Sequence, residues 1–329
     1  MIWVAWRQHR LQLLTGALLL MLTGAFLLAT GPGIFSAFRN TGLAHCLALR
    51  TSDCGDLADA FLNRYGSLQF VVALFLVLPA LGGLFWGAPL IAREVEQGTH
   101  GLAWTQGVTR GRWFGAKLAL LGASAAAGAA ILTWGLSWWS RPLVAAGDQR
   151  FTPGIFDIRG IVPIAYALFA VALGVAAGAL IRRTVAAMAV AFAGFGAVRL
   201  AVDLWLRRHY MAPRVISSTF FGPSPRSGSG DWVLSTKTVD AAGRLLGAGR
   251  GIDLNLVAPR CPALQPGSGQ FPGKDVILGC LQRVGARVVS VYQPGNRYWA
   301  FQWIETGIFV LLAAGLIAVS FWWVRRRVS

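Results

Sequence analysis

Six long apolar runs constrain this chain more than any other feature of its sequence. A helix needs about 20 apolar residues to cross the hydrocarbon core of a bilayer. Five of the six runs contain no charged residue, and the remaining run, the fifth along the chain, carries Arg199 and Asp203. The runs comprise residues 11–30, 68–92, 118–140, 161–181, 185–206 and 306–324.

The composition agrees with a membrane protein. Only 13% of the residues are charged and the mean hydropathy is +0.57, whereas soluble domains carry about 25% charged residues. The chain is therefore predicted to be an all-α polytopic membrane protein with six transmembrane helices. The first run is longer than the apolar region of a signal peptide, which has about 7–15 residues. We therefore expect an uncleaved first span rather than a signal peptide.

The net charge of +17 suggests nucleic-acid binding at first sight. However, the basic residues are scattered between the apolar runs and do not form one basic segment. We therefore expect no nucleic acid among the partners. An anionic lipid surface is the partner that this distribution favours.

Basic residues in short loops indicate the orientation of the spans, because such residues are retained on the cytoplasmic side. With the N-terminus inside, eleven basic residues fall in cytoplasmic segments and six fall in short outer loops. Six spans place both termini on the same side. The chain is therefore predicted to lie in the plasma membrane of a bacterium with both termini in the cytoplasm.

The spans divide the chain into three parts. Residues 1–206 form the N-terminal segment and spans one to five, residues 207–303 form an extracellular domain, and residues 304–329 form span six and a basic cytoplasmic tail. The middle part is rich in Gly, Pro and Ser. Its β-branched segments at residues 231–239 and 286–292 are typical of strands. We expect a small, loop-rich domain with a few strands.

All four cysteines fall in the predicted outer loops, which face an oxidising compartment. Four cysteines allow three pairings. The pairings Cys46–Cys54 and Cys261–Cys280 close the shortest loops, and four free thiols are the alternative. Metal-ligand spacing such as C-x-x-C does not occur, so we expect no metal site.

The N-terminal residues form a candidate interfacial helix. Trp3 and Trp6 lie on one side at helical spacing, with Arg7 beside them. A plain basic flank of the first span is the alternative. Within the spans, Gly83 with Gly87 and Gly174 with Gly178 have the G-x-x-x-G spacing that allows helices to approach closely, and Pro79 and Pro89 should kink the second span.

The spans offer little ionisable chemistry. Arg199 and Asp203, four residues apart on the fifth span, are expected to form an ion pair near the outer interface or to line a polar substrate route. Proton-coupled transport and intramembrane metal catalysis need ionisable groups at depth, which this sequence does not offer. The segment 269–275 approaches a P-loop but lacks its spacing and its Ser or Thr. We therefore expect no enzyme activity and no cofactor in this chain.

The predicted cytoplasmic loop between the second and third spans, residues 93–118, has a recognisable pattern. It begins with two acidic residues and a Gly-Thr turn, continues as a short amphipathic helix, and ends with basic residues at the third span. The pattern resembles the permease subunits of type-2 ABC exporters and looks like their actinobacterial branch. The matching residues are Glu94, Glu96, Gly98, Thr99, Leu102, Thr109, Arg110 and Lys117. The family's Pro before the Ser/Thr-Arg pair is replaced here by Thr105-Gln106-Gly107-Val108.

The resemblance implies a permease that dimerises, with itself or with a paired permease, and binds a separate cytoplasmic ABC ATPase that holds ATP and Mg²⁺. Glu94 and Glu96 would form the charged entry to the coupling segment, Gly98-Thr99 its turn, and Leu102 its contact. Thr109, Arg110 and Lys117 would anchor its return at the lipid interface, and Trp3, Trp6 and Arg7 would face the ATPase.

Two other classes of function compete with this interpretation. A membrane-anchored sensor or binding protein would act through the extracellular domain. A secondary transporter is disfavoured because the middle of the spans lacks ionisable groups. An ATPase encoded next to the chain would favour the permease. The sequence does not indicate the cargo.

Overall fold

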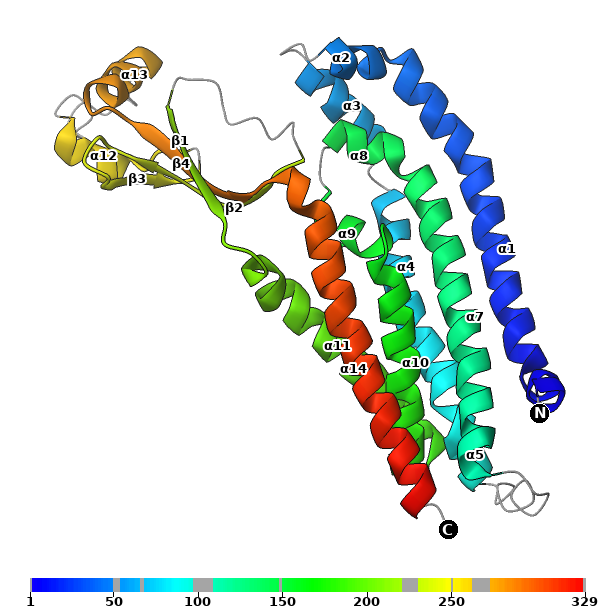
Figure 1. Ribbon diagram of the computed structural model, residues 1–329. Helices are drawn as coiled ribbons and strands as arrows, with labels where there is room; N and C mark the ends of the chain where they lie inside the picture. The colour runs from blue at the N-terminus through cyan, green and yellow to red at the C-terminus, as the bar shows by residue number, and fades with distance from the viewer. Residues whose placement is uncertain are drawn as a thin grey trace. The chain divides into compact units, whose positions relative to one another are not determined.

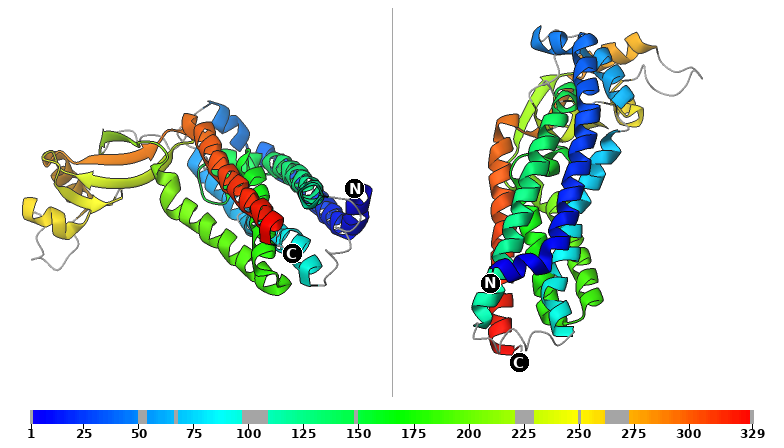
Figure 2. Two further views of the ribbon diagram at one scale, coloured as in Figure 1. Left: turned by 60° about the horizontal axis from the view of Figure 1, so that its bottom comes forward. Right: turned by 90° about the vertical axis from the view of Figure 1, so that its right-hand side faces the viewer.

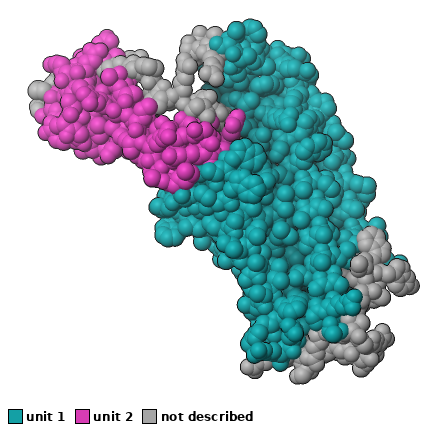
Figure 3. Space-filling model, in the orientation of Figure 1, with its two compact units in different colours: residues 1–147, 152–210, 299–329 teal, residues 148–151, 211–298 magenta. Residues whose placement is uncertain are grey.

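The computed structural model describes residues 2–49, 54–65, 68–96, 109–147, 150–220, 230–249, 251–261 and 273–327. The chain divides into two compact units, which Figure 3 shows in different colours. Unit 1 comprises residues 1–147, 152–210 and 299–329, and unit 2 comprises residues 148–151 and 211–298. Each unit is described by itself.

Unit 1 is helical. Among the described residues, six helical segments are long and apolar enough to cross a membrane, in agreement with the predicted number of spans: Arg10–Asn40, Leu74–Arg93, Gly111–Trp139, Val162–Ile181, Thr184–His209 and Gly295–Arg326. The helical elements are α1 (Ile2–Asn40), α2 (Leu43–Leu49), α3 (Gly55–Tyr65), α4 (Gln69–Gly82), η3 (Gly83–Gly87), α5 (Pro89–Glu96), α7 (Arg110–Trp139), α8 (Arg141–Gly147), α9 (Ile155–Ile158), α10 (Val162–Ile181), α11 (Thr184–Ala201), η4 (Val202–Leu206), η5 (Arg207–His209) and α14 (Tyr298–Arg327).

The helices of unit 1 run side by side, so the bundle has two ends (Figures 1 and 2). Helix α1 begins and helix α14 ends at one of them, which we call the proximal end; α5 ends and α7 begins there as well. The short helices α2, α3 and α8 lie at the opposite, distal end. Both chain termini therefore belong to one end of the bundle.

Helix α10 forms the centre of unit 1. It packs against α4, η3, α5, α7 and α11. In its most apolar stretch of 18 residues, 72% of the residues are buried, compared with 11% in the corresponding stretch of α1. Its sequence is apolar on all sides, which is typical of a helix surrounded by other helices. The side chains of α10 are therefore held in place by several neighbouring helices.

The two G-x-x-x-G motifs meet each other. A Cβ atom at Gly87 would lie 2.8 Å from the carbonyl oxygen of Val171 and 3.2 Å from the Cα atom of Gly174. Gly83 and Gly174 touch, as do Gly178 and the backbone of Ala88. The glycines thus allow the second span to approach α10 at backbone contact distance.

The second span is interrupted where Pro89 was expected to kink it. The five residues Gly83–Gly87 form a π-helical turn, and Pro89 begins α5 directly after it. Proline lacks a backbone N–H and clashes with the preceding turn, and π-helical turns are a common way to accommodate such a break.

The chain is mostly helical, as predicted, and unit 2 adds a four-stranded antiparallel sheet with the strand order β1-β4-β2-β3, in the part of the chain where a few strands were expected. Strands β2 and β4 lie where β-branched residues predicted them. The elements are β1 (Arg214–Thr219), β2 (Trp232–Val239), β3 (Leu245–Ala248), α12 (Leu254–Val257), η7 (Ala258–Arg260), α13 (Lys274–Arg283), β4 (Arg287–Gln293) and η9 (Gly295–Arg297).

The boundaries of unit 2 differ from the expected 207–303. Residues 207–210 and 299–303 belong to the helical unit, and residues 148–151 join unit 2. The reason is that the fifth span continues through η4 and η5 to His209, while α14 already begins at Tyr298. Hydropathy placed these helix ends too close to the middle of the spans because they carry charged and polar residues.

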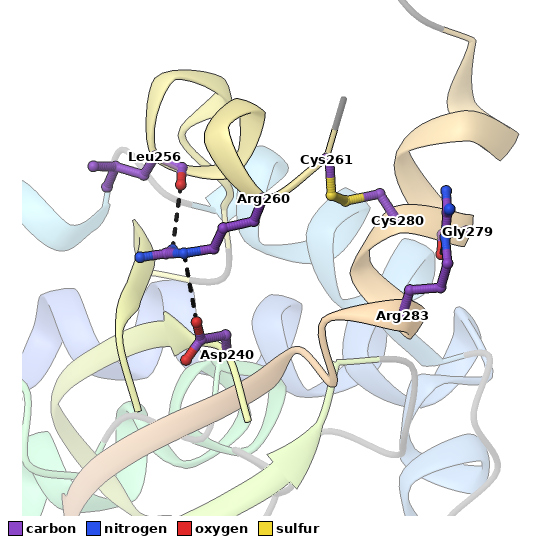
Figure 4. Close-up of a disulfide and its surroundings, with 7 residues drawn as sticks. All are labelled: Asp240, Leu256, Arg260, Cys261, Gly279, Cys280 and Arg283. Atoms are coloured by element: carbon purple, nitrogen blue, oxygen red, sulfur yellow. Dashed lines mark hydrogen bonds and ion pairs between the residues drawn. A yellow bond between two sulfur atoms is a disulfide. The ribbon is translucent and has the colours of Figure 1, made fainter. Parts of the chain in front are cut away.

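Both cysteine pairs are disulfides in the structure. Cys46–Cys54 and Cys261–Cys280 have Cα–Cα distances of 5.8 and 6.0 Å, within the usual range. Cys46–Cys54 belongs to a core cluster with Phe61 at the distal end of unit 1. Cys261–Cys280 joins the end of η7 to α13 inside the core of unit 2, as Figure 4 shows.

Candidate functional site

A cluster of charged and phenolic side chains is buried at the distal end of unit 1. The chain segments that meet there come from α9, α10, the end of the fifth span and α14. The cluster comprises Asp157, Tyr166, Arg199, Asp203, Arg207, Tyr210 and Glu305.

Arg207 is the centre of the cluster and its side chain is 0% exposed. Its Nε and Nη2 atoms donate to the two oxygens of Glu305, each at 2.9 Å. Nη1 donates to Asp203 at 2.6 Å, Nη2 donates to Asp157 at 2.5 Å, and the guanidinium lies 4.4 Å from the ring centroid of Phe156. The planar guanidinium is suited to such a bidentate carboxylate contact.

Arg199 has different partners from the one expected. Instead of Asp203, it forms ion pairs with Asp157 at 2.7 Å and with Glu305 at 3.5 Å. It also donates to the Tyr166 hydroxyl at 2.7 Å and lies over that ring. Asp203 pairs with Arg207, four residues later in the chain.

Hydrogen bonds to Gln302 hold the elements that carry the cluster. Gln302 of α14 accepts from the N–H groups of Ile161 and Val162 at the start of α10, both at 3.1 Å. Its amide donates to the carbonyl of Phe156 in α9 at 3.1 Å. Helices α9, α10 and α14 are therefore joined beside the charges, which fixes the positions of Asp157, Tyr166 and Glu305.

The cluster contains three carboxylates and two guanidinium groups. Burial opposes ionisation of Asp157, but the neighbouring Arg199 and Arg207 guanidinium groups outweigh it and lower the pKa of Asp157. Charges removed from water need such pairing, since an unpaired one costs several kcal/mol. Ionisable residues in membrane segments usually mark functional positions.

The sequence indicated only part of this cluster. Asp157 and Arg207 lie outside the apolar runs and had no pattern of their own, and Glu305 could only be placed near a span end. For Arg207, the available sequence signal was its spacing from Asp203, because an acid followed by a base four residues later on a helix can form an ion pair.

The cluster borders a cavity of about 800 Å³ inside unit 1. The described lining comes from α1, α4, η3, α7 and α10 and is mostly apolar, with Asp157, Tyr166 and Arg199 on its wall. The sequence placed Arg199 either in an ion pair or along a polar substrate route; the structure places it in ion pairs and on the wall of this cavity.

At the proximal end, Glu96 connects two spans. Its Oε2 atom accepts from the hydroxyl of Thr184 at 2.6 Å and from the N–H of Thr184 at 3.2 Å. Thr184 is the first residue of α11, so the carboxylate occupies a helix N-terminus, which favours negative charge. Hydrogen bonds from Thr184 together with nearby Arg183 hold the pKa of Glu96 below its usual value.

Three of the predicted site residues, Thr109, Arg110 and Lys117, lie at the start of α7. The Thr109 hydroxyl accepts from the N–H of Arg112 and caps α7. Arg110 is the first residue of that helix. Lys117 is buried, only 4% exposed, with its ammonium 4.5 Å from the ring centroid of Trp113. Lys117 thus packs inside the bundle near the start of α7.

Several predicted site residues lie outside what the structure describes. Gly98, Thr99 and Leu102 fall in the undescribed segment 97–108, and the side chains of Trp3, Trp6, Arg7, Glu94 and Arg110 are not described, although their backbones are helical. Among the described residues, no group of three or more His, Cys, Asp or Glu side chains could hold a metal ion.

Six membrane-length helices define a multi-pass membrane protein. The comparison with protein families narrows this class. A family model described as "ABC-2 membrane transporter related" matches residues 17–207, which is more than half of the chain, so the chain belongs to that family. No curated protein and no solved structure matches it.

Proposed function

We propose that this chain is the membrane-spanning permease subunit of an ATP-driven ABC exporter. The observation that carries the proposal is the family match over residues 17–207, which covers most of the first and fifth spans, all of the spans between them, and the segment between the second and third. Permeases of the ABC-2 family normally pair with an ATPase subunit. The ATPase would hold ATP and Mg²⁺, and this chain would catalyse no reaction of its own.

The coupling segment would begin at Glu94 and Glu96 and end at Lys117. In support, Glu96 links the end of α5 to the start of α11, and α5 packs on α10 and α11 through small residues such as Ala88, Ala92 and Ala187. A displacement of α5 would therefore be transmitted to two further spans. The turn Gly98-Thr99 and the contact Leu102 would receive the ATPase, together with Trp3, Trp6 and Arg7 of the N-terminal helix.

The proposal includes an orientation and an assembly. The proximal end would face the cytoplasm with both termini, and unit 2 would be extracellular, where the Cys261–Cys280 disulfide is compatible with an oxidising environment. Two permeases, identical or paired, would bind two ATPase copies. The Ala103-Trp104-Thr105-Gln106 variant of the loop supports the actinobacterial branch.

Co-purification tests this function against the sensor alternative. The tagged full-length chain is extracted from its native membrane with a mild detergent, and all bound proteins are identified by mass spectrometry. We expect a cytoplasmic ATPase with a Walker A motif in near-equal amount. Recovery of a kinase or sigma-factor partner in place of an ATPase would overturn the permease proposal and favour a sensor.

A further inference from the structure

The cavity in unit 1 is an elongated space between helices. Its described lining on α7 extends from Leu120 to Leu136, which corresponds to about 24 Å along the helix axis. This length is comparable to the hydrocarbon core of a bilayer, about 30 Å. The volume of about 800 Å³ lies within the range of small-molecule sites, about 300–1,000 Å³.

Helix α1 is held against the other helices at two separate places. Toward the proximal end, the Gln12 amide donates to the carbonyl of Phe85 at 3.4 Å, and Gly16 lies against the ring of Trp86. Toward the distal end, Trp139 donates to the hydroxyl of Thr30 at 2.8 Å. Between these contacts the cavity wall is mostly apolar, with many leucine, alanine and glycine residues and the hydroxyl groups of Ser124 and Thr133, so a ligand there must have a largely apolar body.

The polar end of the cavity offers a hydrogen-bond donor. Arg199 is 13% exposed, whereas the side chain of Asp157 beside it is only 2% exposed. Arg199 uses its Nη1 and Nη2 atoms for Tyr166, Asp157 and Glu305. A guanidinium has five N–H donors, and within the described residues its Nε–H has no hydrogen-bond acceptor.

The charges around Arg199 select against an ionic ligand. A carboxylate or phosphate approaching Arg199 would also approach Asp157 and Glu305, in a cluster that already has one more acid than base. An ammonium would meet Arg199, the most accessible charge on this wall. Because an unpaired charge is costly in an apolar site, an uncharged hydrogen-bond acceptor fits best.

We infer that this cavity binds an uncharged amphiphile within a single copy of the chain, with its hydroxyl or carbonyl group at Arg199 and Tyr166 and its apolar body along α7 and α1. The binding site does not depend on the proposed function. Only the further step, that the bound amphiphile is the exported substrate, depends on it.

Photolabelling of the purified full-length chain tests the site without any ATPase, so its failure is separate from a failure of the proposed function. The probes are three compounds with the same long alkyl chain and a diazirine at its end: an alcohol, a carboxylate and an amine. Mass spectrometry locates the labelled residues. We expect the alcohol to label the segments 11–20 and 120–136 about tenfold more than the other two, a difference of about 1.4 kcal/mol.

A pair of neighbouring variants provides the control. Ala129 lines the cavity, whereas Ala130 is exposed and does not occur in the described lining. Ala129→Phe should fill the space and reduce labelling by the alcohol about tenfold, and Ala130→Phe should leave it unchanged. If Ala129→Phe does not fold, Gly128→Phe replaces it, since Gly128 also lines the cavity. Equal labelling by the three probes, stronger labelling by a charged probe, or equal labelling in both variants would overturn the inference.

Discussion

Individual charges at the distal end of the bundle act as a unit, because each carboxylate of the cluster has an arginine partner. Arg207 holds three carboxylates and has no exposed side-chain surface. A buried ion pair often contributes little compared with an apolar replacement, but removal of one partner leaves the others unpaired. Arg207 is therefore the residue in the cluster on which stability depends most.

Replacement of this arginine should be strongly destabilising. Arg207→Met keeps much of the side-chain volume but leaves Asp203 without an arginine partner and leaves Asp157 and Glu305 with Arg199 alone. We expect a loss of about 3–5 kcal/mol in the free energy of unfolding, measured by denaturant titration in micelles. Arg208→Met changes the exposed neighbour and should have little effect. A similar loss in the two variants would contradict this account of the cluster.

The stability that the Glu96–Thr184 contact gives to the packing of α5 and α11 should depend on pH. The pKa of Glu96 is lowered in the folded chain by hydrogen bonds from Thr184, so the stabilisation is present above the unfolded pKa, about 4.3, and is lost as pH falls through the folded value. The Tm difference between the natural chain and Thr184→Val should therefore be larger at pH 7 than at pH 3. For Thr41→Val, whose hydroxyl donates to the backbone carbonyls of Ala37 and Phe38, the difference should not change with pH; equal behaviour of the two variants would argue against the Glu96 link.

At the scale of the elements, the second span and α10 are joined by glycine. A Cβ atom at Gly174 would lie 2.8 Å from the backbone nitrogen of Ala88 and would also collide with Gly83. Neither helix backbone can move without disturbing the close contact along the whole interface. The two spans should therefore move together.

A single methyl group tests this interface. Gly174→Ala should cost about 1–3 kcal/mol of unfolding free energy, the usual effect of overpacking. Gly196→Ala on α11 adds the same methyl group in open space and should be neutral or slightly stabilising. Denaturant titration of both variants in the same detergent makes the comparison. A neutral Gly174→Ala would show that the interface is looser than described.

The sequence predicted the membrane spans and the disulfides, but it did not predict all of the contacts between distant segments. Apolar run length predicted the six spans, and the shortest loops predicted Cys46–Cys54 and Cys261–Cys280, because both signals are local. The sheet order β1-β4-β2-β3 and the pairing of Arg199 with Asp157 and Glu305 depend on segments far apart in the chain. Because local spacing does not indicate such contacts, one of the two expectations paired Arg199 with Asp203, whereas Arg199 pairs with these distant acids.

At the scale of the whole molecule, the described contacts connect the two ends of the bundle through α11. Its first residue, Thr184, binds Glu96 at the proximal end. Arg199, near its other end, belongs to the buried cluster and borders the cavity. A partner that moves the segment after α5 would act on α11 directly, and through α11 on the wall where the proposed ligand binds.

Stimulation of ATP hydrolysis tests this coupling most directly. The chain and the ATPase proposed as its partner are reconstituted together, and the rate is measured for Glu96→Arg and for Asp56→Arg, an equal charge reversal at an exposed residue of the distal end. We predict that Glu96→Arg abolishes permease-stimulated hydrolysis at normal membrane yield, whereas Asp56→Arg keeps it. Unchanged stimulation in Glu96→Arg would contradict the account, because the segment between the second and third spans would then not transmit the ATPase cycle.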